Sequence, residues 1–170
     1  MNAALALKTA ELIGIKDKSC VTDALKNTIW EGRMEEVLED VYLDGAHNPD
    51  AVAQLVDTVN EIKGSKKICL LFSVVNDKNY DLMIECICKG LNLNAVVLAP
   101  LNSDRAVRTD ELKQKFIDCG AKSVYETDSV EDGFEKLISV KGQGIAVCAG
   151  SLYLVGEVKS LLRRKNNAQF

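Results

Sequence analysis

Continuous apolar segments alternate with amphipathic ones along most of this chain, and that pattern constrains its fold more than any other feature. Segments with strand character cover residues 67–73, 94–99, 123–126 and 144–149. Strands that form unbroken apolar runs are typical of parallel sheets covered on both faces, because neither face meets water. The sequence therefore predicts an α/β fold, with a mostly parallel sheet and helices on both of its faces.

The segments between these strands have apolar residues at helical spacing and residues that commonly begin or end helices. An asparagine, serine or threonine can accept a hydrogen bond from a free N–H of the first turn, and a glycine can take the left-handed conformation after the last turn. The expected cap residues are Asn48 and Gly64 for one helix, Gly90 for the end of the next, and Thr109 and Ser129 for the starts of two more.

The first forty residues break the alternation of strands and helices. Residues 2–13 and 22–29 each have helical character and no strand lies between them, and a short hairpin is expected at 34–43. Two consecutive helices without a strand are what the end of another unit would contribute. We therefore expect two parts, a helical segment over 1–29 and an α/β domain over 30–170.

The six residues from Asp44 to Pro49 (DGAHNP) join an apolar strand to a helix, and they include the only histidine of the chain. Asn48 is a preferred residue at a helix start, and Pro49 suits the first helical position. Free N–H groups and the helix dipole favour an anion here, where His47 also lies. A carboxylate at a strand end, such as Asp44, can hold the hydroxyl groups of a ribose. The junction therefore predicts a nucleotide site.

Composition limits the partners and the location that we expect. The chain has 170 residues, 47% hydrophobic and 27% charged, and a formal net charge of −4, which gives no general attraction to nucleic acid or to anionic membranes. It has no apolar segment of membrane-spanning length and no secretory leader pattern, so we expect a cytoplasmic protein. The six cysteines are expected to be reduced thiols, and no histidine and cysteine cluster predicts a metal site.

Four motifs together resemble one family. Asp44 to Pro49 (DGAHNP), Gly150 to Val158 (GSLYLVGEV), Trp30 to Arg33 (WEGR) and the opening Asn2-Ala-Ala are similar to folylpolyglutamate synthase, which is also dihydrofolate synthase in bifunctional members, of the Mur ligase superfamily. The resemblance covers the carboxy-terminal part of the family pattern. It implies a third, Rossmann-like domain from about Trp30 onward, preceded by two helices from the end of the central ATPase domain.

The resemblance also implies an activity. Members of the family ligate L-glutamate to folate or dihydropteroate, using ATP and Mg²⁺ through an acyl phosphate. The P-loop signature G-x-x-x-x-G-K-[ST], which cradles a triphosphate, is absent from this sequence. We therefore expect an N-terminal P-loop domain as the partner, holding most of the metal contacts, and no catalysis by this chain alone.

Site residues follow from the family motifs one at a time. The resemblance implies that Asn2 reaches the adenine, that Arg33 contacts ATP and that Asp44 holds the ribose. It places His47, the candidate catalytic residue, beside the reacting phosphate and the incoming glutamate. For Asp44→Ala in an intact enzyme, we expect a higher ATP requirement with little change in folding.

Two positions depart from the family motifs. Glu31 stands where the family has proline, which adds a negative charge near a phosphate-binding arginine and removes a rigid residue. Residues 73–79 (SVVNDKN) are similar to the family's D-K-D loop, but Asn79 replaces its second aspartate. A cation at this loop is therefore not expected.

Each site residue also has a structural interpretation. His47 is compatible with a hydrogen-bonded residue at a helix entry, and Asp44 with a side chain that caps its own turn. Arg33 is compatible with an ordinary surface residue and Asn2 with a helix cap.

The alternative to a ligase domain is a non-catalytic module that binds a nucleotide or another ligand. An oxidoreductase is disfavoured, because the junction lacks the G-x-G-x-x-G turn of dinucleotide-binding folds.

Overall fold

The computed structural model describes residues 2–28 and 30–167. Within it the chain divides into two compact units, residues 1–31 and residues 32–170. The division falls two residues after the boundary expected between 29 and 30. The assignment of the first unit to the end of a central ATPase domain stays a prediction.

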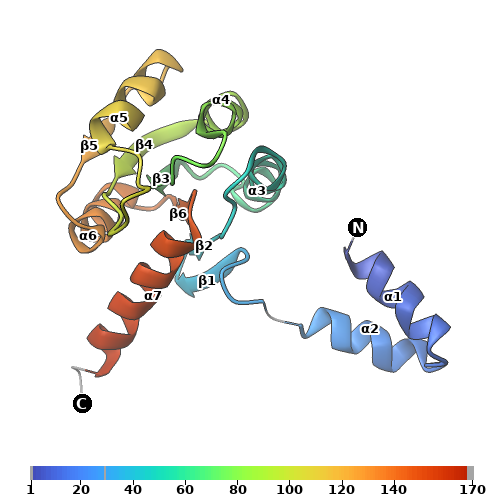
Figure 1. Cartoon of the computed structure of the whole chain (residues 1–170). Coiled ribbons are helices and arrows are strands. Elements are labelled where there is room, and N and C mark those ends of the chain that lie inside the picture. The colour runs from blue at the N-terminus through green and yellow to red at the C-terminus, as the bar shows by residue number, and fades with distance from the viewer. Residues whose placement is uncertain (1, 29, 168–170) are drawn as a thin grey trace. The chain divides into compact units, whose positions relative to one another are not determined.

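The first unit consists of two helices, α1 (Asn2–Leu12) and α2 (Lys18–Lys26) (Figure 1). The expected start of the second helix at residue 22 is wrong, because the Oδ1 atom of Asp17 accepts a hydrogen bond from the backbone N–H of Cys20 at 3.0 Å. This cap satisfies a free donor of the first turn, so the helix begins one turn earlier than the apolar spacing indicated.

The second unit contains a six-stranded sheet with the order β1-β2-β6-β3-β4-β5 (Figure 1). β1 pairs with β2 in the antiparallel sense, and the other neighbouring strands are parallel. The strands are β1 (Glu35–Leu38), β2 (Val41–Leu43), β3 (Ile68–Phe72), β4 (Leu93–Leu98), β5 (Val124–Glu126) and β6 (Ile145–Ala149). The mostly parallel sheet, the hairpin and the four later strands predicted from the sequence are confirmed.

Helices cover both faces of this sheet. Buried side chains of α3 (Pro49–Ile62), α4 (Tyr80–Gly90) and α5 (Thr109–Asp118) pack in one hydrophobic cluster. Those of α6 (Val130–Lys141) and α7 (Leu152–Asn167) pack in a second cluster. Strands β3 and β6 are buried at every position, as their continuous apolar sequence requires. Of the helices that the structure describes, none is long and apolar enough to cross a membrane.

Three of the predicted cap residues act as expected. Asn48 and Ser129 precede α3 and α6, and their side chains accept from the backbone N–H groups of Ala51 and Asp132. Gly64 follows the last turn of α3 with a φ of 54°, the left-handed conformation that favours glycine. These residues mark where α3 begins and ends and where α6 begins.

Two cap predictions are wrong. Thr109 is the first residue of α5, and Arg108 occupies the cap position without a side-chain hydrogen bond to the helix. Gly90 is the last residue of α4 and does not follow it. A Cβ atom at Gly90 would overlap Cγ1 of Val56 on α3, so this glycine permits close packing of two helices.

Candidate active site at the carboxyl edge of the sheet

The carboxyl ends of β2 and β6 are tied together by backbone hydrogen bonds. The N–H of Asp44 donates to the carbonyl of Cys148 at 2.9 Å, and the N–H of Gly150 donates to the carbonyl of Ala46 at 2.9 Å. The DGAHNP junction and the glycine that opens the GSLYLVGEV motif therefore lie side by side. In a sheet of this kind, ligands bind at this edge.

Gly150 is required by its conformation and by its surroundings. Its φ is 105°, and a Cβ atom there would overlap the carbonyl oxygen of Ser73 and lie 2.6 Å from an edge atom of the Phe72 ring. The Ser73 hydroxyl donates to the carbonyl of Ala99 at 2.6 Å and is buried. The glycine and the serine therefore hold the ends of neighbouring strands close together.

The carboxylate of Asp44 is the central polar group of the junction. Its side chain is buried, with 9% of its surface exposed. Oδ1 accepts from the N–H of Ala46 at 2.8 Å and Oδ2 accepts from the N–H of Met34 at 2.9 Å. Because each oxygen has two lone pairs, each retains one acceptor position for a further donor. The turn-capping interpretation is therefore confirmed, and it leaves room for a ligand.

Burial raises the pKa of Asp44, against the backbone hydrogen bonds from Met34 and Ala46 and the nearby charge of Arg33, which act to lower it. Burial wins because an ionised carboxylate loses hydration there. This geometry argues against the expectation that Asp44→Ala leaves folding nearly unchanged. An alanine would leave two backbone N–H groups without their acceptors.

The segment before β1 is held against the junction. The N–H of Gly45 donates to the carbonyl of Gly32 at 2.6 Å. A Cβ atom at Gly45 would lie 2.5 Å from Cδ2 of Leu152 on α7, so a larger residue there would require the exposed Leu152 side chain to move. Arg33, the next residue after Gly32, is exposed and close enough for its charge to act on Asp44.

The conformation of this segment is strained at Met34, whose φ of 41° lies in the left-handed region. Such a conformation costs a non-glycine residue of order 1 kcal/mol and persists where the surroundings enforce it. Here the carboxylate of Asp44 enforces it, because it accepts the Met34 N–H. The strain lies one residue from Arg33, at the edge where we predict the nucleotide.

Sequence reasoning missed an ion pair that supports this segment. The N–H of Gly32 donates to Oε2 of Glu35 at 2.6 Å, and Nζ of Lys159 on α7 lies 2.9 Å from both carboxylate oxygens. Burial raises the pKa of Glu35, but its bonds to Lys159 and Gly32 outweigh burial and lower it. The two residues are 124 positions apart, so no local pattern in the sequence indicates the pair.

His47 is half-buried at the start of α3. Its Nδ1 atom lies 2.6 Å from the carbonyl oxygen of Gly45. A carbonyl oxygen only accepts, so Nδ1 carries the proton of this bond, and Nε2 keeps its lone pair in the neutral ring. The interpretation of His47 as a hydrogen-bonded residue at a helix entry is confirmed, and it fixes which nitrogen is available for chemistry.

The loop that resembles the D-K-D motif is held by side chains from two other segments. Asp77 forms an ion pair of 3.1 Å with Arg105, which also donates to the hydroxyl of Tyr153 at 3.1 Å. Asn79 caps α4 by accepting from the N–H of Leu82 at 3.4 Å. The residue that replaces the family aspartate therefore begins a helix.

The role expected of Asn2 is not tested by these contacts. Asn2 lies in α1, but its side chain is outside the residues whose surroundings are described. Its proposed contact with adenine stays a prediction. Among the residues that the structure describes, no group of three or more histidine, cysteine, aspartate or glutamate side chains is suited to a metal ion.

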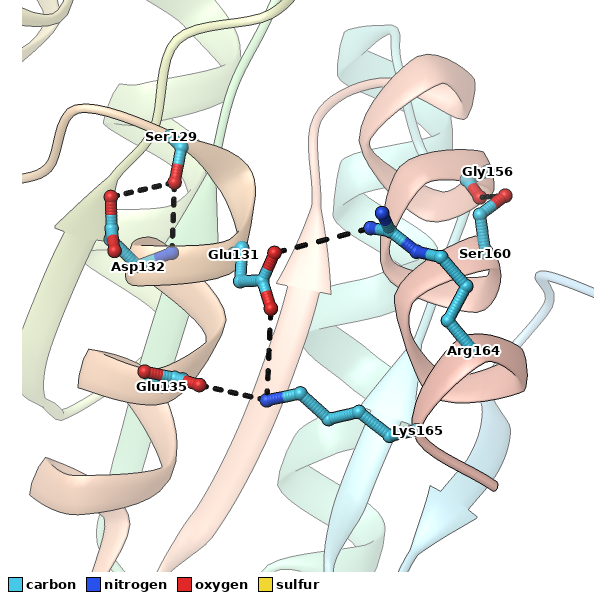
Figure 2. Close-up of polar contacts among 8 residues, drawn as sticks. All are labelled: Ser129, Glu131, Asp132, Glu135, Gly156, Ser160, Arg164 and Lys165. Carbon is cyan, nitrogen blue, oxygen red and sulfur yellow. Dashed lines mark hydrogen bonds and ion pairs between the residues drawn. The ribbon is translucent and has the colours of Figure 1, made fainter. Parts of the chain in front are cut away.

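A cavity of about 590 Å³ lies between α6 and α7, and it is lined by none of Arg33, Asp44 and His47. Figure 2 shows the polar contacts along it, where Lys165 bonds Glu135 at 2.7 Å and Arg164 lies 4.0 Å from Glu131. Exposed ion pairs of this kind contribute little to stability.

Comparison with known proteins identifies the family of this chain. Residues 32–152 match the model of the Mur ligase, glutamate ligase domain. The dihydrofolate synthase/folylpolyglutamate synthase of Bacillus subtilis is 30% identical over 171 residues, which cover 95% of this chain and 38% of that protein. A probable bifunctional folylpolyglutamate synthase/dihydropteroate synthase of Halobacterium salinarum is 32% identical over 161 residues, covering 93% of this chain and 19% of that protein.

Solved structures agree on the fold. E. coli FolC in complex with DHPP and ADP aligns with a TM-score of 0.85 and 20% identity, over 97% of this chain and 39% of that one. The bifunctional enzyme of Yersinia pestis complexed with AMPPNP and Mn ion aligns with a TM-score of 0.77 and 21% identity, over 86% of this chain and 35% of that one. The chain thus spans less than half the length of these relatives. It belongs to the Mur ligase family as a glutamate ligase domain, of the kind that forms the carboxy-terminal part of folylpolyglutamate and dihydrofolate synthases.

Proposed function

We propose that this chain supplies the carboxy-terminal part of an ATP-dependent ligase that joins L-glutamate to folate or dihydropteroate through an acyl phosphate. The DGAHNP junction carries the proposal. It places a buried carboxylate with spare acceptor positions, Asp44, next to the start of α3 at the carboxyl edge of the sheet. The family relationship supplies the reaction, and this geometry supports a nucleotide at that edge.

The chemistry of the donors and acceptors fits a nucleotide. Ribose hydroxyl groups donate, and the carboxylate of Asp44 retains lone pairs that can accept them. Phosphate oxygens accept, and the exposed guanidinium of Arg33 offers the planar set of donors that matches them. Asn2 is proposed to contact the adenine on the resemblance alone. ATP supplies the phosphoryl group that activates the carboxylate substrate.

His47 is proposed to act on the incoming glutamate. With Nδ1–H held by the Gly45 carbonyl, the free lone pair of Nε2 can accept a proton from the amine that attacks the activated carboxyl group. The hydrogen bond also orients the ring before substrate arrives, so less ordering is required during the reaction.

The remaining parts of the site are proposed to come from a P-loop domain that this sequence does not contain. That domain would hold the triphosphate and most of the contacts to Mg²⁺. Closure of this chain over the bound nucleotide would bring Arg33 and Asp44 to it and exclude water from a reactive acyl phosphate. Alone, the chain is proposed to be catalytically inactive and to act in the cytoplasm only as part of the longer enzyme.

Substitution of Arg33 tests the site in a chain joined to a P-loop-bearing front portion. Loss of a charged hydrogen bond to phosphate should raise the KM for ATP about tenfold or more in Arg33→Ala. Arg164→Ala is the matched control, because Arg164 is also exposed but lies far from the junction. It is twelve residues along α7 from Leu152, the residue beside Gly45, which is about 18 Å along the helix axis.

An unchanged KM for ATP in Arg33→Ala would contradict the phosphate role. An equal rise in both variants would point to a general effect of surface charge and would also contradict it. If the joined protein binds nucleotide but never consumes ATP in the presence of both substrates, the non-catalytic binding module is the better description of the chain.

A further inference from the structure

Two cysteines lie at the edge of the sheet opposite the candidate active site. Cys88 is in the last turn of α4, and Cys119 is the residue that follows α5. Each of these helices connects parallel neighbouring strands, so each runs back from the carboxyl edge and ends at the amino edge. Their neighbouring ends therefore place both thiols away from the DGAHNP junction.

The two thiols share their surroundings. Both cysteines line a cavity of about 410 Å³ between α4 and α5, and both line a second cavity of about 200 Å³ beside the loops that lead into β4 and β5. The Cys119 thiol also lies close enough to Cys88 to help raise the pKa of the Cys88 thiol. The pair is thus within reach of one another and of a small molecule.

The other cysteines do not form such a pair. Cys69 and Cys148 are buried in strands, and Cys20 belongs to the other unit. Cys86 is half-buried on α4 two residues before Cys88, so it faces a different side of the helix. Among the described residues, no group of three or more histidine, cysteine, aspartate or glutamate side chains suited to a metal ion surrounds the pair.

We propose that Cys88 and Cys119 form a reversible disulfide by exchange with a low-molecular-weight disulfide such as oxidised glutathione. Cys119 is exposed and reacts first. Its sulfur attacks one sulfur of glutathione disulfide, whose S–S bond breaks, and one glutathione leaves as a thiol. Cys88 then attacks the Cys119 sulfur, and the second glutathione leaves.

The exchange balances without another oxidant. Two protein thiols are oxidised to one disulfide, one glutathione disulfide is reduced to two thiols, and the two protein thiol protons end on the released glutathione molecules. Burial, together with the charge and hydrogen bond of Cys119, raises the pKa of Cys88 to about 12. Cys88 is therefore the slower nucleophile, which fits a resolving role in the second step.

Mass spectrometry after treatment with oxidised glutathione tests the proposal. The 170-residue chain with Cys20→Ser is used, because Cys20 is the other exposed cysteine. After alkylation of free thiols, peptide mapping should find the Cys88 and Cys119 peptides linked, with a loss of two hydrogen atoms. Dithiothreitol should reverse the link. Further substitution Cys88→Ser should abolish it and trap one glutathione on Cys119.

The matched control is Cys86→Ser on the same helix, which should form the link to the same extent. Persistent glutathione on Cys119 with an alkylated Cys88 would overturn the proposal, because the resolving step would be absent. A link from Cys119 to Cys86 would overturn it as well. The main measurement keeps both cysteines of the pair, so it does not depend on whether a substituted pair still folds.

Discussion

At the scale of single residues, Asp44 combines a structural role with the proposed ligand role. Its two carboxylate oxygens accept backbone N–H groups from residues two and ten positions away. The nearer bond, to Ala46, is the turn cap that the sequence indicated. The farther one, to Met34, depends on the hairpin that brings β1 beside β2. No local pattern of residues predicts this hydrogen bond.

Substitution of Asp44 should reveal the structural role. Asp44→Ala leaves two backbone donors, the buried N–H of Ala46 and the half-buried N–H of Met34, without their acceptors and should lower the free energy of unfolding by about 2–4 kcal/mol. Asp44→Asn keeps one acceptor oxygen and should cost about half as much. Urea denaturation of both variants checks this expectation, and an alanine variant as stable as the parent would contradict it.

The raised pKa of Asp44 predicts a pH dependence with a definite sign. A carboxyl group whose pKa is higher in the folded state binds more protons there, so its contribution to stability is full below the unfolded pKa and is lost as pH rises through the folded pKa. The parent should therefore lose stability relative to Asp44→Asn as pH rises from about 3 to about 7. An increase in the stability of the parent relative to Asp44→Asn over this range would contradict a raised pKa for Asp44.

At the scale of elements, the packing of α3 on α4 shows where sequence reasoning stopped. Gly90 ends an amphipathic segment, so it has the pattern of a helix cap. The structure places it inside the helix, where the reason for a glycine is Val56 on the neighbouring helix. A local pattern predicts that a helix ends nearby, but it does not predict which residue of another helix packs against that end.

Gly90→Ala should therefore destabilise the protein even though alanine is the better helix former. Steric overlap with Val56 should cost about 1–3 kcal/mol. Gly156→Ala on α7 is the control, since its new Cβ meets no atom within 4 Å, and it should stabilise by about 0.5–1 kcal/mol. Adding Val56→Ala to Gly90→Ala should recover part of the loss in a double-mutant cycle measured by denaturation. Strict additivity would contradict the contact.

Element type was predictable where one physical signal dominated. The strands that are buried on both faces were visible as apolar runs, and α3 and α6 were marked by Asn48 and Ser129. The start of α2 was predicted wrongly because the apolar spacing begins later than the helix, whose first turn is capped by Asp17. The Glu35–Lys159 ion pair was missed because it joins the two ends of the second unit.

At the scale of the whole molecule, residues 32–170 contain their own core. The two hydrophobic clusters draw their described members from Met34 onward, with strands β2, β3, β4 and β6 between them. After deletion of residues 1–31, the remaining unit should therefore still unfold in one cooperative transition. Circular dichroism during denaturation measures this, and loss of a cooperative transition would contradict a self-contained unit.

The candidate site and the cysteine pair occupy opposite edges of the same sheet. The carboxyl edge carries Asp44, His47 and Gly150, where strand ends and a helix start meet. The amino edge carries Cys88 and Cys119 at two helix ends. Because the two sites share no residue, oxidation of the pair and binding at the junction can be measured separately.

In the proposed function, this chain supplies part of an active site that a P-loop domain must complete. The most direct test measures ADP release from ATP with L-glutamate and either dihydropteroate or tetrahydrofolate, for the chain alone and for the chain joined to a P-loop-bearing front portion. Release that depends on glutamate is expected from the joined protein, and none is expected from the chain alone. Release by the chain alone, or by neither form, would contradict it.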